Sequence, residues 1–381
     1  MHDRIARRFT RSEPRLRALA YLKGLIGTSE RKNSWQLAEA AGELTPDGMQ
    51  RLLNQAHWDA DLVRDDLREY VLEHFGDPQE AVLVTDETGF LKKGDKSVGV
   101  QRQYTGTAGK RENCQIGVFL CYTSPKGAAF IDRALYLPKG WAQDATRRRE
   151  AGVPEEVKFK TKPKLAEEML RRAFEAGVEA AWVTADAVYG GDRKLRMFLE
   201  ERGQPFVLAV KRTEPLWTLD ESRGPGQVAA EELAKRTIPE GSSSWARLSA
   251  GDGSSKGPRL YDWALVPLFR LQLSEEERYW GHWLLARRSL EDPEEVSYYV
   301  VFAPKASTTL MQVVRVAGTR WRIESCFEMA KGEFGLDEYE VRKWAAWQRH
   351  IILSLLVHAF VSVVSSEEET KKGDLLLAAP W

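Results

Sequence analysis

The chain has 381 residues, 43% of them hydrophobic, and its 56 basic and 56 acidic residues give a formal net charge of zero. This length is enough for more than one domain with a large core, and the zero net charge by itself argues against a nucleic-acid partner. Cys114, Cys121 and Cys326 have no C-x-x-C spacing, which argues against a zinc site or a disulfide framework and favours a reducing, cytoplasmic compartment. We find neither a membrane-length apolar run nor an N-terminal leader pattern, so we expect a soluble protein with no membrane partner.

Residues 1–78 are predicted to form an N-terminal helical domain. Ser34–Gly42 has the pattern of a helix capped by serine and ended by glycine, and a second helix starts at Thr45–Leu53 with Pro46 in its first turn. Residues 1–34 carry nine basic and three acidic side chains. Short helices in a basic segment favour a helix-turn-helix-like DNA-binding unit; the alternative is a plain helical cap on the next domain.

Residues 79–212 are predicted to form the first part of an α/β catalytic core. The apolar run Ala81–Thr85 stops at Asp86, so we expect a buried strand with this carboxylate at its exposed end. Glu87 should lie on the opposite face, where it either supports the metal ligands or has a structural role. A three-stranded antiparallel meander and an amphipathic helix follow. Their predicted ranges are Gly99–Tyr104, Gln115–Tyr122 and Phe130–Leu137 for the strands and Pro163–Ala176 for the helix.

A second copy of the strand-aspartate pattern ends at Asp186. The following helix, over about 192–201, leads to the strand Pro205–Val210, and a strand-helix-strand crossover implies parallel pairing. Each aspartate taken alone also fits a turn-capping role. Two strand-end aspartates from distant sequence can, however, converge on a divalent cation.

Residues 213–297 are predicted to form a β-rich insertion domain, because turn-forming clusters at Gly241–Ser244 and Gly251–Pro258 separate short aromatic runs. Residues 298–381 should complete the core with a strand at Tyr298–Ala303 and two long helices. These helices are predicted at Thr308–Phe334, with a break near Gly318, and at Arg342–Ser365, followed by a frayed tail.

The first of these closing helices carries the third candidate carboxylate. Arg320, Glu324 and Lys331 share one sector of the helix, beside its apolar stripe. One interpretation is an ion-pair ladder from Arg320 to Glu324 and from Glu328 to Lys331. The other makes Glu324 a metal ligand, with Arg320 and Lys331 on phosphate oxygens and Glu328 as the rival carboxylate.

Asp86–Phe90 followed by Gly99–Lys110 resembles the DDE transposases of bacterial insertion sequences. The resemblance is closest to the group named for insertion sequence 701, a relative of the hairpin-forming transposases. It extends over nearly the whole chain and includes Asp186–Gly190, Gly257–Trp263 and Gly335–Arg342. It implies an RNase H-like mixed sheet flanked by helices, with the β-rich insertion between the second aspartate and the glutamate.

The resemblance also implies a set of site residues. Asp86, Asp186 and Glu324 would bind two Mg²⁺ ions, with Mn²⁺ as a substitute. The family signature Y-x2-R-x3-E-x6-K maps onto Arg320, Glu324 and Lys331, but its tyrosine position is Ala317, which removes one expected phosphate contact. Further implied DNA contacts are Arg102, Lys110 and Arg322. Candidates for an aromatic wedge that holds a flipped base are Trp263, Trp280 and Trp283, although a small β-domain also needs aromatic side chains for its own core.

The implied function is cleavage and joining of DNA strands by two-metal chemistry, through a hairpin intermediate. The implied partners are double-stranded DNA, as transposon ends and target, and a second copy of the chain, in the bacterial cytoplasm at the nucleoid. The alternatives are a DNA-binding transposase descendant without catalysis and a stand-alone metal-dependent endonuclease. A glycosidase with paired carboxylates is disfavoured because the arginine and lysine suit phosphate.

Overall fold

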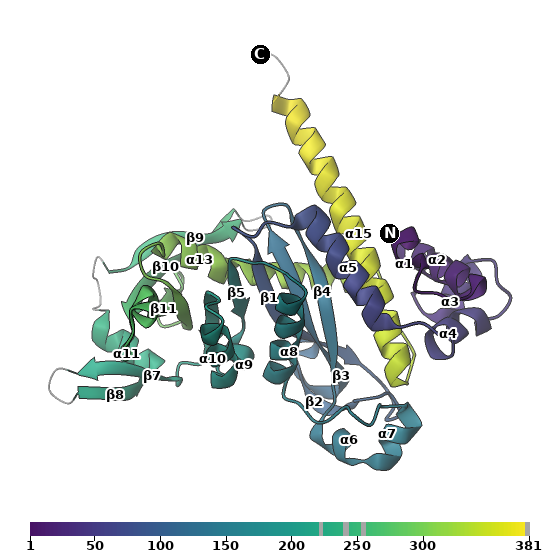
Figure 1. Cartoon of the computed structure of the whole chain (residues 1–381), viewed down its shortest axis with the longest axis horizontal. Helices are drawn as coiled ribbons and strands as arrows, with labels where there is room; N and C mark the ends of the chain where they lie inside the picture. Colours follow the sequence, from purple (N-terminus) through teal and green to yellow (C-terminus); the bar gives the residue numbers. More distant parts are fainter. Residues whose placement is uncertain (221–223, 239–243, 253–256, 378–381) are drawn as a thin grey trace. The chain divides into compact units, whose positions relative to one another are not determined.

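The computed structural model describes residues 1–220, 224–238, 244–252 and 257–377 (Figure 1). The predicted turn clusters at 241–244 and 251–258 lie mostly outside these ranges, as do the last four residues of the predicted frayed tail. The chain forms two compact units. Unit 1 consists of Met1–Asp77, Asp86–Val178 and Arg322–Trp381, and unit 2 consists of Pro78–Thr85 and Glu179–Trp321.

The N-terminal helices belong to unit 1. They are α1 (His2–Ala6), α2 (Ser12–Ile26), α3 (Ser34–Ala40), α4 (Asp47–Asn54) and α5 (Ala60–Phe75). The cap of α3 is Asn33 rather than the predicted Ser34, because the Asn33 side chain accepts hydrogen bonds from the amides of Trp35 and Gln36. Pro46 lies immediately before α4 instead of inside its first turn.

The predicted antiparallel meander is confirmed in unit 1. Strand β3 (Lys110–Ser124) pairs with both β2 (Gln101–Thr105) and β4 (Gly127–Tyr136), and β1 (Val82–Leu91) lies on the other side of β3 from β2 in the strand order. The short helices η1 (Gly106–Ala108), α6 (Lys139–Gln143) and α7 (Ala145–Ala151) and the amphipathic helix α8 (Lys162–Glu175) complete this part of the chain.

The closing helices α14 (Trp321–Gly332) and α15 (Trp344–Leu377) supply the other side of the unit 1 core. The Phe327 ring of α14 packs 5.3 Å from Phe119 and 5.0 Å from Phe130, measured between ring centroids. Helix α15 runs beside α5 and packs on β4 (Figure 1). Its Trp344–Glu368 segment is long and apolar enough to cross a membrane, contrary to our expectation from the sequence, but 61% of the apolar window is buried. Its apolar character is therefore explained by the core.

Unit 2 is a mixed sheet in the order β1, β5, β6, β12, β11, β10, β9. Strands β5 (Trp182–Ala185) and β6 (Phe206–Val210) are parallel, as predicted from the crossover helix, and β1 is parallel to β5. The remaining strands are antiparallel: β12 (Val296–Pro304), β11 (Trp280–Arg288), β10 (Pro258–Pro267) and β9 (Ala246–Asp252). The expected mixed α/β architecture is thus confirmed.

The predicted β-rich insertion mostly extends the sheet of unit 2, because β11 pairs along its whole length with β12. A separate two-stranded hairpin is formed by β7 (Pro215–Asp220) and β8 (Gly224–Ala229). The helices of unit 2 are α9 (Ala187–Gly190), α10 (Arg193–Glu201), α11 (Ala230–Thr237), α12 (Glu275–Tyr279) and α13 (Leu310–Thr319).

The predicted helix break near Gly318 lies at Arg320, between α13 and α14. Gly318 itself is needed for close packing of α13 on β9. A Cβ atom at this position would lie 1.8 Å from the carbonyl oxygen of Ala250, a distance that no side chain tolerates. The glycine therefore lets α13 approach the edge of the sheet.

Candidate active site

Asp86 does not end its strand, which corrects the prediction from the sequence. Strand β1 continues to Leu91, because Thr88 and Phe90 are residues that favour strands and both are buried. Asp86 is half-buried in the middle of β1, and its Oδ1 accepts a hydrogen bond of 2.8 Å from the amide of Glu87. The Glu87 carboxylate accepts a 2.5 Å hydrogen bond from Lys162 of α8.

Asp186 does end its strand, and it also caps a helix. Its Oδ1 accepts a 2.8 Å hydrogen bond from the amide of Val188 at the start of α9, so the turn-capping interpretation is correct for this residue. The parallel register between β1 and β5 ends with Thr85 opposite Ala185. Each of these two register partners is followed directly by an aspartate, Asp86 after one and Asp186 after the other.

Asp186 lines a cavity of about 390 Å³ in unit 2 together with Arg320. Two further arginines, Arg212 and Arg287, line the same cavity. Arg287 donates a 2.9 Å hydrogen bond to the hydroxyl of Ser297, and Arg212 lies just beyond the end of β6. Three guanidinium groups beside one carboxylate make a cavity suited to a phosphate group.

Sequence reasoning selected Arg320 but missed Arg212 and Arg287. The position of Arg212 gave a signal that was not used: it follows strand β6, which is parallel to β5, at the same sheet edge as Asp186. The sequence did not indicate Arg287, because the alternating pattern of an antiparallel strand predicts that an arginine there faces solvent.

Glu324 lies on α14, next to the buried Ile323 and one turn before Phe327. Its side chain is half-buried, whereas that of the rival Glu328 is exposed. Across the described part of the chain, no three His, Cys, Asp or Glu side chains are grouped closely enough to hold a metal ion. The structure therefore brings Asp186 and Arg320 together, but it does not display a three-carboxylate cluster.

Lys331 contacts the strand that carries Asp86. Its ammonium group donates hydrogen bonds of 3.2 Å to the carbonyl oxygen of Gly89 and to the hydroxyl of Thr107, so within the described residues it does not form the predicted ladder contact to Glu328. Burial lowers the pKa of Lys331, and the nearby Asp337 only partly opposes this shift.

The other predicted DNA contacts have different surroundings. Arg102 is exposed on β2, and Lys110 is exposed and forms a 3.1 Å ion pair with Glu112. Arg322 donates a 3.1 Å hydrogen bond to the carbonyl oxygen of Ser124. Arg102 and Lys110 are thus accessible to a ligand from solvent, while Arg322 uses part of its guanidinium to hold the end of β3.

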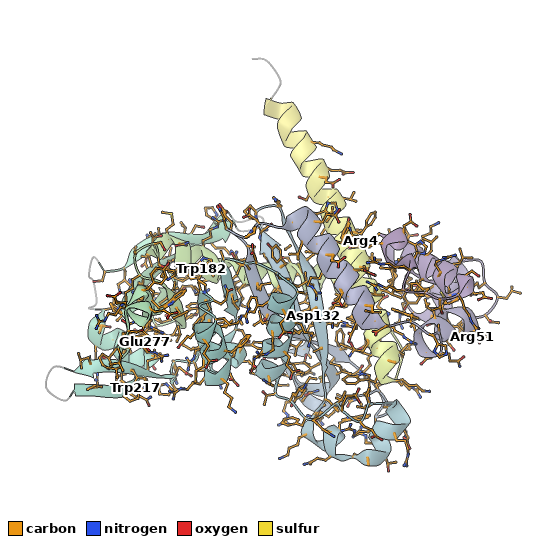
Figure 2. The ribbon with its side chains drawn as sticks, in the orientation of Figure 1. Arg4, Arg51, Asp132, Trp182, Trp217 and Glu277 are labelled. Atoms are coloured by element: carbon orange, nitrogen blue, oxygen red, sulfur yellow. The ribbon has the colours of Figure 1, made fainter. Side chains whose placement is uncertain are left out.

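The three tryptophans proposed as a base wedge are mainly packed. Trp263 is fully buried, Trp280 stacks on Phe302 with 4.5 Å between ring centroids, and Trp283 is half-buried. Trp217, on the β7–β8 hairpin, is 42% exposed, and sequence reasoning did not select it (Figure 2). For most of these rings the core role that we weighed as the alternative describes their surroundings better.

Comparison with known proteins gives matches over most of the chain. The family model described as "DDE superfamily endonuclease" matches residues 4–252, which include Asp86 and Asp186. The family model described as "Transposase DDE domain" matches residues 160–360, which include Asp186 and Glu324. A curated relative, "Probable transposase for insertion sequence element IS701" from Microchaete diplosiphon, is 30% identical over 202 residues. That match covers 51% of this chain and 48% of the relative, so it spans about half the length of each.

Proposed function

Because the chain belongs to the DDE superfamily endonucleases, we propose that it is the DNA transposase of a bacterial insertion sequence and cleaves and joins DNA strands at its element's ends. The observation that carries this proposal is the placement of Asp86 and Asp186, each directly after one of two register partners on parallel neighbouring strands. Neighbouring strands lie about 4.8 Å apart, so carboxylates that follow such partners can serve the same ions.

The proposed ligands fit a hard divalent cation. Asp86, Asp186 and Glu324 offer only carboxylate oxygens, the donors that Mg²⁺ prefers. Two Mg²⁺ ions, or Mn²⁺ in their place, would polarise the attacking oxygen and neutralise charge on the leaving oxygen. The hydrogen bond from the Val188 amide fixes the orientation of the Asp186 carboxylate.

The basic residues would hold the DNA backbone. Arg320, Arg212 and Arg287 line the cavity that contains Asp186, where they would bind phosphate oxygens and orient the scissile bond. Lys331 would add a cation close to the Asp86 strand. Catalysis in this arrangement depends on positioning and charge neutralisation and needs no histidine base.

We further propose a two-step reaction at one site. Water first hydrolyses a phosphodiester, which leaves a 3′-hydroxyl on the element and a 5′-phosphate on the flanking strand. This hydroxyl then attacks the phosphodiester of the opposite strand, which closes a hairpin and releases the flanking strand with a 3′-hydroxyl. Trp217 is an exposed aromatic candidate for holding the distorted DNA end, in addition to the half-buried Trp283. The proposed setting is the bacterial cytoplasm, with a homodimer bound to two DNA ends.

The test is an incubation of the full chain with a DNA duplex that carries the element's ends, in the presence of Mg²⁺. The products are separated on a denaturing gel. We expect a covalently closed hairpin that migrates at about twice the single-strand length, because the same carboxylates would hold the metal ions for both in-line attacks. Blunt ends without a hairpin would overturn the two-step mechanism but leave the transposase assignment in place. Specific binding without any cleavage would instead support a non-catalytic descendant, and cleavage without joining would support a stand-alone endonuclease.

A further inference from the structure

We propose that unit 1 contains a second anion-binding site, which takes a phosphate oxyanion in a cavity beside β4. The cavity has a volume of about 700 Å³ and lies between parts of α5, β4, α8 and α15. Of the described residues that line it, none is one of the three proposed metal ligands. Its lining has more basic than acidic side chains. The basic residues are Arg64, Arg133, Lys158, Lys160, Arg172 and Arg349, the acidic ones are Asp59, Asp61, Glu156 and Glu168, and the aromatic ones are Trp58 and Trp344.

Arg133 gives the first reason for this proposal. Its side chain is 1% exposed, and its Nη1 donates a 2.8 Å hydrogen bond to Asp61. Its Nε and Nη2 are buried and have no hydrogen-bond partner among the described residues. Buried donors on a charged group are costly when they are unpaired, so this guanidinium lacks acceptors that its surroundings should provide.

The two unpaired donors lie on the same edge of the guanidinium. Nε and Nη2 of an arginine form a fork that matches two oxygens of a carboxylate or phosphate. Arg8 uses this edge on Asp66, with both donor–acceptor distances at 2.7 Å. Arg172 uses it on a single oxygen, Oδ2 of Asp132, at 3.1 and 2.9 Å. Arg133 presents the same fork without an oxyanion.

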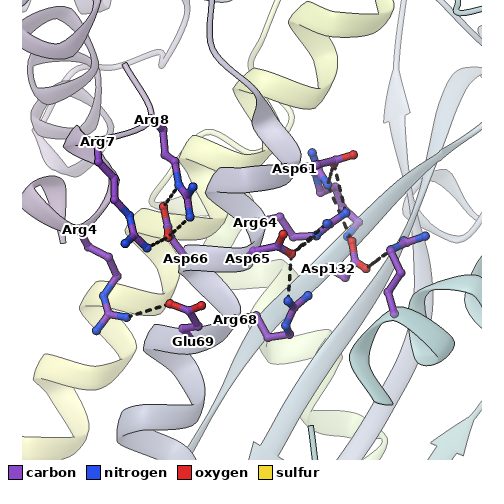
Figure 3. A network of polar contacts seen from close by, with 12 residues as sticks. Arg4, Arg7, Arg8, Asp61, Arg64, Asp65, Asp66, Arg68, Glu69 and Asp132 are labelled. Carbon is purple, nitrogen blue, oxygen red and sulfur yellow. Dashed lines mark hydrogen bonds and ion pairs between the residues drawn. The ribbon is translucent and has the colours of Figure 1, made fainter. Parts of the chain in front are cut away.

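The charge balance around Arg133 also favours an anion. Its cluster joins four arginines to three aspartates by ion pairs, part of the network in Figure 3. When all seven are ionised, the cluster carries one net positive charge. The arginines are Arg64, Arg68, Arg133 and Arg172, and the aspartates are Asp61, Asp65 and Asp132.

Two of these arginines, Arg64 and Arg133, have pKa shifts in opposite directions. Burial lowers the pKa of Arg64, but Asp132, Asp61 and Asp65 outweigh that effect and raise it overall. Burial also lowers the pKa of Arg133, and there Asp61 and Asp132 do not make up the difference. The acidic neighbours therefore compensate the charge of Arg133 less fully than that of Arg64, which itself also lowers the pKa of Arg133.

The cavity is large enough for phosphate and has more than one cation to offer. Arg172 also lines it, with 36% of its side chain exposed. Lys158, in the loop between α7 and α8, donates a 2.9 Å hydrogen bond to the carbonyl oxygen of Glu155. A dianion that places two oxygens on the Arg133 fork leaves others for these cations, whereas a monocarboxylate does not. The shared chemistry is a phosphate oxyanion, either free or carried by DNA.

The test is isothermal titration calorimetry of the full chain with sodium phosphate, without Mg²⁺ and at constant ionic strength. We expect two phosphate sites in the natural protein, one in the Asp186 cavity and one at Arg133, each with weaker binding of acetate. Arg320→Gln should weaken the first and leave the Arg133 site unchanged. Arg133→Lys keeps a positive charge but loses the fork, so the phosphate Kd of its site should rise at least tenfold. Arg8→Lys, which changes the same kind of fork on Asp66, is the matched control and should keep the phosphate Kd of the natural protein.

If circular dichroism shows that Arg133→Lys does not fold, Arg172→Gln replaces it, with an expected rise of several-fold in the phosphate Kd. Absence of binding heat in the natural protein, or equal Kd values for the natural protein and the folded lining variant, would overturn the proposal. Tighter binding of acetate than of phosphate would do the same. A titration in the presence of saturating duplex separates the sources: loss of the phosphate signal of the Arg133 site assigns that site to a DNA phosphate, and its retention assigns it to free phosphate.

Discussion

The strands that carry Asp86 and Asp186 begin with the same pattern, an apolar run that reaches an aspartate, yet they continue differently. After Asp86 the strand goes on to Leu91, whereas after Asp186 the chain turns at once into α9. The residues after the aspartate explain the difference. Thr88 and Phe90 favour a strand and are buried, while Gly190 and Gly191 permit a tight turn. A shared motif therefore predicts where a strand begins better than where it ends.

The largest expected effect is loss of DNA cleavage when either aspartate loses its charge. Asp86→Asn and Asp186→Asn should each reduce the cleavage rate at least about 100-fold, because a metal ligand is lost. Stability should separate the two positions, since only Asp186 caps a helix. Asp186→Ala should lower the free energy of unfolding by about 1 kcal/mol relative to Asp186→Asn, which keeps a capping side chain. Urea denaturation and a gel cleavage assay measure the two effects.

If Asp186→Asn cleaves DNA at the natural rate, Asp186 is a cap only, and the two strands do not share a function. Asp86→Ala against Asp86→Asn is the matched pair. Asp86 caps no helix, so this pair measures only the loss of the hydrogen bond that Asp86 accepts from the Glu87 amide and should differ in stability by less than the Asp186 pair.

The next effect concerns the third carboxylate. Glu324→Gln should reduce cleavage by a factor similar to that of the aspartate variants, whereas Glu328→Gln should change it less than about twofold, as expected for an exposed side chain away from the chemistry. The cleavage assay on both variants decides between them. A large loss in Glu328→Gln alone would move the assignment by one helical turn.

A smaller effect is expected from the glycines that follow the two aspartates. A Cβ atom at Gly190 would lie 1.9 Å from the backbone oxygen of Ala209, and one at Gly89 would lie 1.9 Å from the side-chain oxygen of Thr105. Gly190→Ala should lower the free energy of unfolding by about 1–3 kcal/mol, because backbone cannot move aside easily. Gly89→Ala should lower the free energy of unfolding by less, because the atoms it meets belong to the Thr105 side chain. Adding Thr105→Ala should recover part of that loss. Gly226→Ala, where a Cβ atom would meet nothing within 4 Å, is the control.

The smallest expected effect is a pH dependence at the end of the Asp86 strand. Lys92 donates a 2.9 Å hydrogen bond to the carbonyl oxygen of Tyr339, and burial lowers its pKa to about 8, against the opposing effect of Asp337 and Glu340. The folded state therefore binds fewer protons than the unfolded state between about pH 8 and the ordinary lysine pKa of about 10.4. In that range the Lys92 contribution to stability should rise with pH.

Lys92→Met should remove this contribution, which would appear as a difference in the slope of unfolding free energy between pH 7.5 and 9.5. Equal slopes in the natural protein and the variant would show that Lys92 is accessible to water in solution. Lys126→Met is a suitable control, because Lys126 is an exposed lysine that also donates to a backbone carbonyl.

The sequence predicted those parts of the fold that depend on local pattern. The meander, the parallel pairing of β5 with β6 and the helix break beside Gly318 all follow from periodicity and turn residues. The two aspartates were selected because they follow apolar runs, and Glu324 because it shares a helix sector with Arg320 and Lys331. Pairing between distant segments was not predictable in this way. The insertion became an extension of the sheet because β11 pairs with β12, and no local signal specifies that partner.

The burial of charged residues was also not predictable where it depends on contacts between distant segments. Asp132 and Arg133 occupy a predicted strand and would ordinarily be expected at the surface, yet they are 2% and 3% exposed. Their burial depends on Arg172 of α8 and Asp61 of α5, which are distant in sequence. Arg287 joins the cavity of Asp186 for a similar reason: the position of β11 in the sheet places it there. Long-range pairing, rather than local preference, decides which charges are buried.

Strand β1 passes from unit 2 into unit 1 between Thr85 and Asp86, and both units are built from separated stretches of chain. During protein synthesis, unit 1 must therefore wait for α14 and α15 while the whole of Glu179–Trp321 is made, roughly 7–30 s at a rate of about 5–20 residues per second. Until then the apolar face of β4 that α15 covers is open to chaperones. Glu324 is also the last of the three carboxylates to leave the ribosome. A nascent or truncated chain that stops before α14 therefore lacks a proposed metal ligand, so under the proposed function unfinished copies should not cleave DNA.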